Sequence, residues 1–328
     1  MRGRSEIKEL ARERIRAERA TAILLPFVLG LMTYASTLLD RIGAGLGRVP
    51  FMIIFWAGML VLWVMTVNMS GAYVKMYERK HATVGELFTG LGIRFFRKLG
   101  GFLWMVLWLI IWSLPSLAVA TALAYASGAI VARFGPWGFH IAFELSGWRA
   151  FLAMLCFAPV VIKGLSYFMV PYILGYHTEV KAIQALRLSR RMTKGYKGSI
   201  FAMHLSFIGW VLLGLLPIII FGFFGILSEN SGSGLVAVLF GVLGSVALYV
   251  VLIVPYMYTS IAGLFVELRD KGIAEGVVSR EELGMSSVAF VQPGADAPMD
   301  VPLEVELVIA PPMEEELADK DDLTDEGS

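Results

Sequence analysis

The chain has 328 residues, of which 57% are hydrophobic and only 17% are charged. A water-soluble protein of this length needs far more charge to cover its surface, so the composition excludes an ordinary soluble enzyme and indicates a membrane protein. The single cysteine, Cys156, excludes a disulfide framework within the chain.

The near-neutral total charge hides an uneven distribution. Residues 1–271 carry 26 Lys and Arg against 12 Asp and Glu, whereas residues 272–328 carry 2 against 15. The pattern predicts a basic membrane body followed by an acidic tail. Five prolines and the ending "EEELADKDDLTDEGS" leave little apolar surface to bury, so we expect residues 269–328 to form a disordered cytoplasmic tail.

The first 19 residues have an amphipathic pattern. The stretch "SEIKELARERIRAERA" begins with Ser5, a residue type that caps helices, and mixes both charge signs at helical spacings. We expect residues 1–19 to form a cytoplasmic amphipathic helix, which lies on the membrane surface or packs beneath the bundle.

Six apolar segments reach the roughly 20 residues that are needed to cross about 30 Å of hydrocarbon. They predict a membrane domain over residues 20–268, with spans near 20–39, 51–74, 101–125, 148–172, 200–227 and 235–266. The predicted fold class is therefore an all-α integral membrane protein with about six transmembrane helices.

Lysine and arginine gather before the first span, between the second and third, and between the fourth and fifth, whereas the alternate loops hold few. Cytoplasmic loops of membrane proteins carry this excess, so both termini should be cytoplasmic in a multi-pass protein of the cell membrane.

Two basic segments on that side have helical patterns. In "TVGELF", Thr83 and Glu86 fit a capping box, and the pattern continues through Leu91 and Phe95 as a helix half sunk in the membrane interface.

The second segment, "TEVKAIQALRLSRRMTKGYKG", places four cations on one helical face at i, i+3, i+4 and i+7. These are Arg187, Arg190, Arg191 and Lys194. This face suits phospholipid headgroups, a membrane partner or the acidic tail; the alternative is that its charges serve only to orient the protein.

A few polar side chains fall inside predicted spans, where ionisable groups are costly and mark candidate sites. They are Asn68, Lys163, Ser166 and His204. No carboxylate lies in a span interior to pair with Lys163. Its ammonium therefore reaches the membrane surface, has a buried structural partner, or marks a substrate or lipid site.

The sequence lacks HExxH, GxSxG, P-loop and CxxC motifs, and its four histidines are dispersed. We therefore predict no catalytic residues, cofactor, metal or nucleic-acid partner. The favoured hypothesis is a non-enzymatic membrane protein that interacts with lipids, other membrane proteins or itself. The alternatives are a small transporter with a polar site around Asn68, Lys163 and His204, and a lipid-modifying enzyme.

Four stretches carry a resemblance to a known family. They are "RSEIKELARERI", "ELFTGLGIRFFRKL", "PVVIKGLSYFMVPYILGYHTEVKAIQALRLSRRMTKGYKGSIFAMHLSFIGW" and "VPYMYTSIAGLFVEL". Through them the chain resembles the bacterial domain-of-unknown-function family 975 of integral membrane proteins, over most of residues 1–268. The resemblance implies a helical membrane fold and supplies no activity.

Two features depart from the family pattern. About 40 extra residues separate Trp112 from Pro159, and Val160 stands where the family usually has glycine. The insert makes a full outward and return crossing plausible for this chain.

Overall fold

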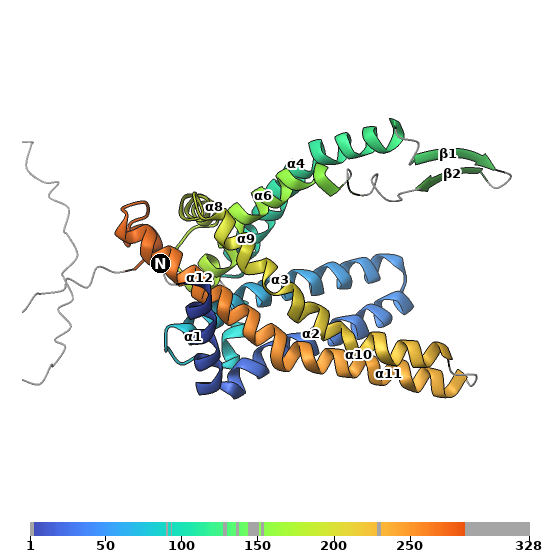
Figure 1. Ribbon diagram of the computed structural model, residues 1–328, viewed down its shortest axis with the longest axis horizontal. Helices are drawn as coiled ribbons and strands as arrows, with labels where there is room; N and C mark the ends of the chain where they lie inside the picture. Colours follow the sequence, from blue (N-terminus) through green and yellow to red (C-terminus); the bar gives the residue numbers. More distant parts are fainter. Residues whose placement is uncertain are drawn as a thin grey trace, which may run out of the picture. The chain divides into compact units, whose positions relative to one another are not determined.

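The computed structural model describes residues 3–89, 91–92, 94–126, 130–135, 138–143, 151, 154–227 and 231–285, which are predominantly helical (Figure 1). Six helical stretches are long and apolar enough to cross a membrane, and each overlaps one predicted span. They are Arg19–Gly43, Arg48–Tyr77, Phe95–Leu123, Met154–Tyr176, Lys197–Leu227 and Gly232–Ala274. Residues 286–328, most of the predicted acidic tail, lie outside the described residues.

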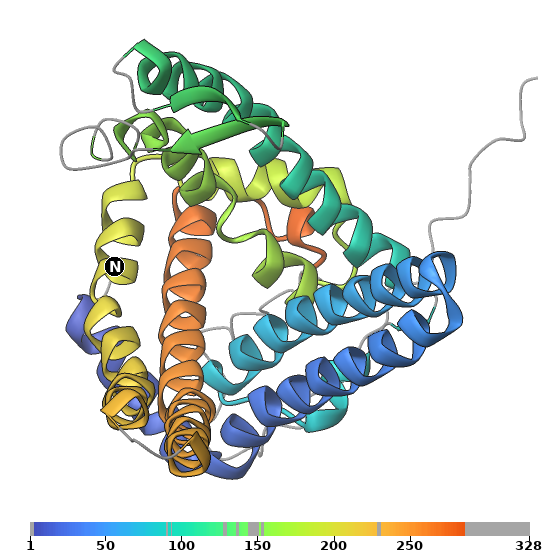
Figure 2. The ribbon, with the colours of Figure 1, turned by 90° about the vertical axis from the view of Figure 1, so that its right-hand side faces the viewer.

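The N-terminal half begins with a short helix, which three long helices and one 3-10 turn follow. Its elements are α1 (Arg4–Ala17), α2 (Arg19–Leu46), α3 (Arg48–Tyr77), the 3-10 turn η1 (Val84–Phe88) and α4 (Phe95–Ala126). Helices α2 and α3 pack side by side (Figure 2). They are joined by Gly47, whose φ of 117° lies in a region that favours glycine.

The C-terminal half contains more and shorter helices. They are α6 (Ala158–Tyr167), α7 (Val170–Tyr176), α8 (Ala182–Met192), α9 (Lys197–Leu205), α10 (Ile208–Leu227), α11 (Ser231–Leu248), the π-helical turn η2 (Tyr249–Ile253), α12 (Val254–Ala274) and the 3-10 turn η3 (Glu281–Leu283). Helices α10 and α11 form a second close pair (Figure 2).

The buried core lies where the basic segments meet, and we call this region the basic end. It contains α1, η1, α7, α8, the last part of α3 and much of α12, which contact one another. Most buried side chains belong to these elements. In each apolar window of the six long stretches, by contrast, only 6% to 22% of the residues are buried, so most of that apolar surface is left for lipid to cover.

The fourth predicted span is broken rather than continuous. Helix α6 ends at Tyr167, a turn follows at Phe168 and Met169, and α7 begins with Pro171 as its second residue. Proline has no N–H to donate and its ring clashes with the preceding turn, so a straight helix cannot continue through it. The break separates a largely exposed apolar helix, α6, from a largely buried one, α7.

The segment "TVGELF" corrects a prediction. It forms the 3-10 turn η1 instead of the start of a helix, and Thr83 makes no side-chain capping hydrogen bond. Glu86 instead pairs with Lys75 of α3 at 2.7 Å. The tertiary ion pair takes the carboxylate that a capping box would use, and α4 starts only at Phe95.

The N-terminal helix also begins differently from the prediction. Gly3, not Ser5, is its N-cap residue, and the Gly3 N–H donates to Glu6 Oε2 at 2.9 Å. The predicted amphipathic helix at residues 1–19 is present as α1, with Ile7 and Ala11 buried.

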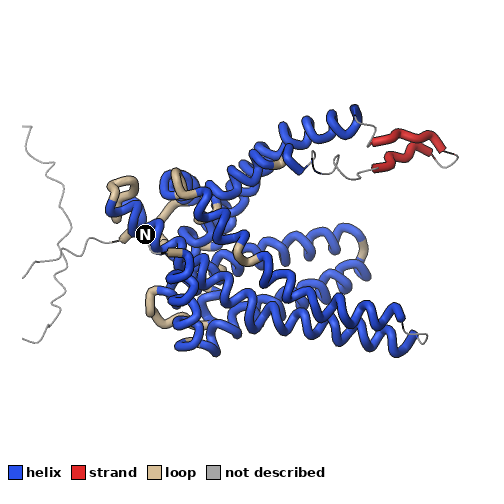
Figure 3. The backbone as a smooth tube through the Cα atoms, in the orientation of Figure 1, coloured by secondary structure: helices blue, strands red, loops and turns tan. Residues whose placement is uncertain are grey.

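The all-α prediction is wrong for the insert, where the described residues include two β-strands. Strands β1 (Ile130–Gly135) and β2 (Gly138–Phe143) form an antiparallel hairpin, with Ile130 opposite Phe143 and Gly135 opposite Gly138 (Figure 3). β-branched and aromatic residues favour strands, and the glycines at the connected ends suit a tight hairpin.

The boundary of the folded body also differs from the prediction. Residue 269 was expected to start the tail, yet α12 continues to Ala274, and residues 275–285 follow it back onto the body with Val278 and Leu283 buried. We call residues 275–285 the strap. The apolar side chains of the strap pack into the core at the basic end. The composition of this segment does not predict such packing.

Candidate functional site

Helix α8 presents the basic stripe that the sequence predicts. Ala185, Leu186, Leu188, Ser189 and Met192 are buried on one side of it. Arg187, Arg190 and Arg191 are exposed on the other side, and Lys194, also exposed, follows in the turn after the helix ends at Met192, so the predicted four-residue stripe extends just beyond α8. The amphipathic period of 3.6 residues thus becomes one face packed on the body and one basic face open to its surroundings.

The α8 helix is attached at the break between α6 and α7. The Ser189 hydroxyl donates to the Ser166 carbonyl at 2.8 Å, and the Thr193 hydroxyl donates to the same carbonyl at 3.3 Å. A helix break leaves backbone carbonyls without their helical N–H partners, and where these carbonyls are buried other donors must hydrogen-bond to them. Ser166, a predicted site residue, therefore has a structural position in which it anchors α8.

The strap engages one of the four cations. Arg191 Nη1 lies 2.8 Å from Glu282 Oε1, and the same guanidinium donates to the Val277 carbonyl. Gln184 also donates to the Glu282 carbonyl at 2.9 Å. The other three cations, which have no side-chain partner among the described residues, are Arg187, Arg190 and Lys194.

Other basic residues at this end are used by the fold. Arg97 donates to the carbonyls of Leu174, His177 and Val180, at 3.0, 3.3 and 2.6 Å, so it caps the C-terminal end of α7. Lys75 is paired with Glu86. The basic end therefore divides into cations that hold the structure together and cations that remain available.

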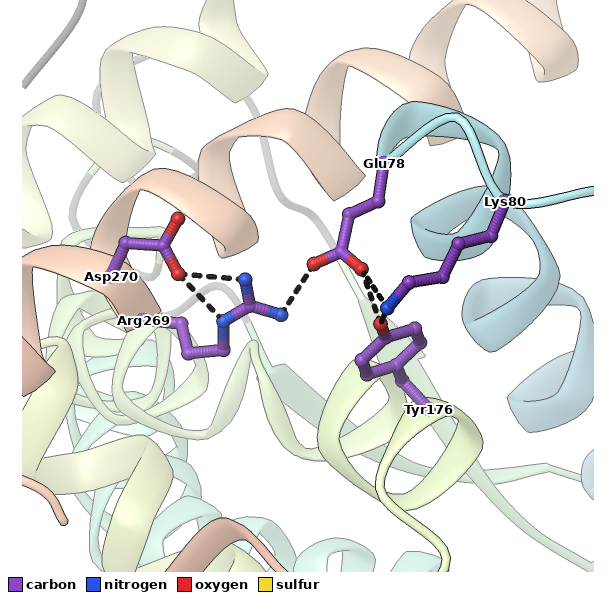
Figure 4. Close-up of polar contacts among 5 residues, drawn as sticks. All are labelled: Glu78, Lys80, Tyr176, Arg269 and Asp270. Atoms are coloured by element: carbon purple, nitrogen blue, oxygen red, sulfur yellow. Dashed lines mark hydrogen bonds and ion pairs between the residues drawn. The ribbon is translucent and has the colours of Figure 1, made fainter. Parts of the chain in front are cut away.

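A buried charged junction joins α12, α7 and the end of α3 (Figure 4). Arg269 Nη1 lies 2.6 Å from Glu78 Oε1, and its Nη2 lies 2.7 Å from Asp270. The other Glu78 oxygen accepts from Lys80 at 2.7 Å and from the Tyr176 hydroxyl. Burial by itself raises the pKa of Glu78, but the hydrogen bonds from Lys80 and Tyr176 and the charge of Arg269 outweigh it and lower that pKa.

Sequence reasoning missed this junction, because Glu78 and Arg269 are 191 residues apart and each stands among other charges. The available signal was the rarity of acids: Glu78 is one of only 12 in residues 1–271. A carboxylate that follows an apolar span directly, in a basic loop, is a reasonable candidate for a buried partner.

Asn68 has a local structural role. Its side-chain amide donates to the carbonyls of Leu87 and Thr89, both at 2.8 Å, and its oxygen accepts from the buried Lys98 ammonium. Asn68 and Lys98 are only 2% and 3% exposed. This pair fixes the loop after η1 against α3.

Lys163 and His204 have other neighbours. The Lys163 ammonium lies 3.9 Å from the centre of the Trp112 ring, a cation–π contact between α6 and α4. His204 Nδ1 lies 2.8 Å from the Ile200 carbonyl, and its ring meets Phe168 edge-on at 4.8 Å. Among the described residues, the contacts of Asn68, Lys163 and His204 do not join the three to one another.

Among the described residues, no group of three or more His, Cys, Asp or Glu side chains is placed to hold a metal ion. The prediction of no metal and no cofactor remains a prediction.

The long apolar helices, with a charged core at one end, indicate a multi-pass helical membrane protein. Residues 1–272 match the family model described as "Protein of unknown function (DUF975)". Since the match covers most of the chain, the chain belongs to this family, which confirms the resemblance drawn from its motifs. The family description assigns no activity. Comparison with curated proteins and with solved structures found no match.

Proposed function

We propose that this chain is a non-enzymatic membrane protein that binds anionic phospholipid headgroups through the basic face of α8. The observation that carries the proposal is the availability of Arg187, Arg190 and Lys194. They are exposed and have no side-chain partner among the described residues, whereas Arg97, Lys98 and Arg269 of the same end are consumed by structural contacts.

The orientation of α8 favours lipid over a soluble acidic protein. Figure 1 views α8 along its axis, whereas α2, α3, α10 and α11 run across the view. A helix that lies across the spanning helices, at one end of them, runs along the membrane surface. Its cations then face the headgroups, where each Lys or Arg contributes about 1 kcal/mol of attraction to an anionic leaflet.

The positive-inside rule supports a cytoplasmic position for the basic end. In this arrangement α1 and the strap, near the two ends of the described chain, are both cytoplasmic. The anionic lipids of the inner leaflet are then the natural ligands of α8.

The transporter alternative required Asn68, Lys163 and His204 to share one polar site. Asn68 bonds to Lys98, Lys163 lies over Trp112, and His204 contacts Ile200 and Phe168. No described contact favours that alternative or a lipid-modifying enzyme.

The test is lipid binding by the full chain, with phosphatidylglycerol titrated into the detergent-purified protein and the bound lipids counted by native mass spectrometry. The variant R187Q/R190Q/K194Q should weaken binding about a hundredfold, since each of the three lost charges removes roughly 1 kcal/mol. The matched control is R16Q/R41Q/R48Q, which removes three exposed charges outside α8 and the strap. Equal affinities in the two variants would exclude the α8 face as the binding site; binding of a neutral lipid equally well would exclude headgroup charge as its basis.

A further inference from the structure

A second basic stripe lies on α1. Arg4, Lys8 and Arg12 follow one another every fourth residue, so they occupy one face of the helix at intervals of about 6 Å. No carboxylate lies within ion-pair distance of any of the three among the described residues. Glu6 and Glu13 of the helix and its C-cap Glu18 contact Gly3, Arg79 and His81, and Glu9 is exposed and makes no ion pair with the stripe among the described residues.

Aromatic rings and hydroxyls hold two of these cations in place. The Lys8 ammonium lies 4.6 Å from the centre of the Phe207 ring and donates to the Ser206 hydroxyl at 2.6 Å. The Arg12 guanidinium lies 5.2 Å from the centre of the Tyr256 ring, and its Nη2 lies 3.3 Å from the Tyr256 hydroxyl. An ammonium has three donors and a guanidinium has five, so most of their donors stay available.

The electrostatics of this stripe favour the binding of an anion. Burial of Lys8 lowers its pKa, and the charges of Arg12 and Arg4 lower it further. Three like charges along one helix face destabilise the helix unless a counter-ion binds. An anion with several oxygens would relieve this repulsion.

The position of the stripe along the membrane normal points to the class of anion. The Ser206–Phe207 turn directly precedes α10, whose 20 residues are long enough to cross about 30 Å of hydrocarbon. Phe207 and Trp210 each meet Tyr256 edge-on, at 5.6 and 5.3 Å. Tryptophan and tyrosine gather at headgroup level in membrane proteins, so the cations above these rings lie at the level of the lipid phosphates.

We propose that Arg4, Lys8 and Arg12 bind the phosphate of a membrane phospholipid, with its acyl chains along α10 beside the half-buried Trp210. The rings hold Lys8 and Arg12 in position before the lipid arrives, so little side-chain freedom is lost on binding. Arg4, at the free end of the stripe, completes the site. This site is separate from the α8 face and does not depend on it.

The experiment repeats the phosphatidylglycerol titration by native mass spectrometry, now with the full-length R187Q/R190Q/K194Q variant as background so that α8 makes no contribution. Adding K8Q/R12Q should weaken the tightest remaining lipid about thirtyfold. The matched control R16Q/R19Q, which removes two exposed charges nearby, should leave that lipid unchanged. Equal effects of the two pairs would overturn the proposal, even if the α8 variant behaves as expected.

Two further variants separate binding from folding. Arg4 has no side-chain contact among the described residues, so R4Q should weaken the lipid severalfold without a change in melting temperature. The charge-retaining swap K8R/R12K should keep the lipid bound. Unchanged affinity in R4Q, or loss of the lipid in the swap, would show that these residues only attach α1 to the body and would overturn the proposal.

Glycerol phosphate in millimolar excess separates a lipid from a soluble phosphate compound. Retention of phosphatidylglycerol in its presence supports the lipid site, because the acyl chains add their own contacts. Displacement of the lipid by glycerol phosphate would overturn the lipid assignment.

Discussion

Arg269 and Glu78 form an ion pair of 2.6 Å that ties α12 to the end of α3, and their side chains are only 6% and 13% exposed. Around it Lys80, Tyr176 and Asp270 complete a network that no single segment of the chain contains. The helices of the basic end are thus joined by charge as well as by apolar packing.

Breaking this ion pair should destabilise the protein strongly. We expect R269M or E78Q alone to lower the free energy of unfolding by about 1 to 3 kcal/mol, because each removes the closest charged partner of a mostly buried group. Glu78 then keeps Lys80 and Tyr176, and Arg269 keeps Asp270. The double variant E78Q/R269M should lose less than the two single losses combined. Denaturant unfolding in detergent, followed by fluorescence, measures these values.

The matched control is R79Q. Arg79 pairs with Glu13 at 3.5 Å, but these side chains are 70% and 62% exposed, so its loss should cost about 1 kcal/mol or less. A loss in R269M no larger than in R79Q would contradict a structural role for the junction.

His177 should make stability depend on pH. Burial, followed by the positive charge of Arg269, lowers its pKa from 6.5 to about 4. The unfolded chain therefore takes up a proton between pH 6.5 and 4, whereas the folded chain does not. Stability should be full above pH 6.5 and should fall by up to about 3 kcal/mol as the pH drops to 4.

The check is the melting temperature of wild type and H177F between pH 7.5 and 4.5. The variant should show a flatter profile over this range, whatever its absolute stability. Glu78 acts in a lower window: its lowered pKa gives stability that is lost only below its ordinary value near 4.5. Identical slopes in H177F and wild type would show that another group titrates.

Helices α3 and α7 approach so closely at Gly71 and Gly175 that a Cβ on Gly71 would overlap the Gly175 backbone. We expect G71A to destabilise the fold by about 1 to 3 kcal/mol or more, because neither backbone has room to give way. Gly164 of α6 is the matched control, since a Cβ there meets nothing within 4 Å. G164A should stabilise the fold by about 0.5 to 1 kcal/mol. Thermal unfolding should therefore give G164A a higher melting temperature than G71A. A higher melting temperature for G71A would contradict close packing of α3 against α7.

Lys163 should contribute to packing and not to lipid binding at the α8 face. Its contact with the Trp112 ring predicts a coupling energy of about 0.5 to 2 kcal/mol in a cycle of K163M, W112L and the double variant. Phosphatidylglycerol affinity should be the same in K163M and wild type. A coupling near zero would leave Lys163 without its described partner, and a weakened lipid affinity would place it in the binding site.

Local features of the fold could be read from the sequence because they depend on residues close along the chain. Six apolar runs of span length correspond to six long apolar helices, and the 3.6-residue period from Ala182 to Met192 correctly separates a buried face from a basic one. The same local reading was wrong for "TVGELF", because Glu86 pairs with Lys75 at the end of the preceding helix, α3, instead of capping a helix of its own.

The candidate site was only partly predictable for the same reason. The sequence places Arg187, Arg190, Arg191 and Lys194 on one face, but it cannot show that Glu282 engages Arg191 and leaves the others open. Asn68 was recognised as unusual, yet its true partner, Lys98, comes from another helix.

The sequence by itself determined the membrane class, the six apolar helices, the basic stripe and the family, since hydropathy, helical period and motif order are properties of neighbouring residues. Only the tertiary structure decided which charged side chains pair within the fold and which stay exposed without a partner among the described residues. Glu78 and Arg269 meet because α3 and α12 pack at the same end, and Lys8 and Arg12 lie over Phe207 and Tyr256 because α1 docks there. Such pairings depend on distances in space, which separation along the chain does not encode.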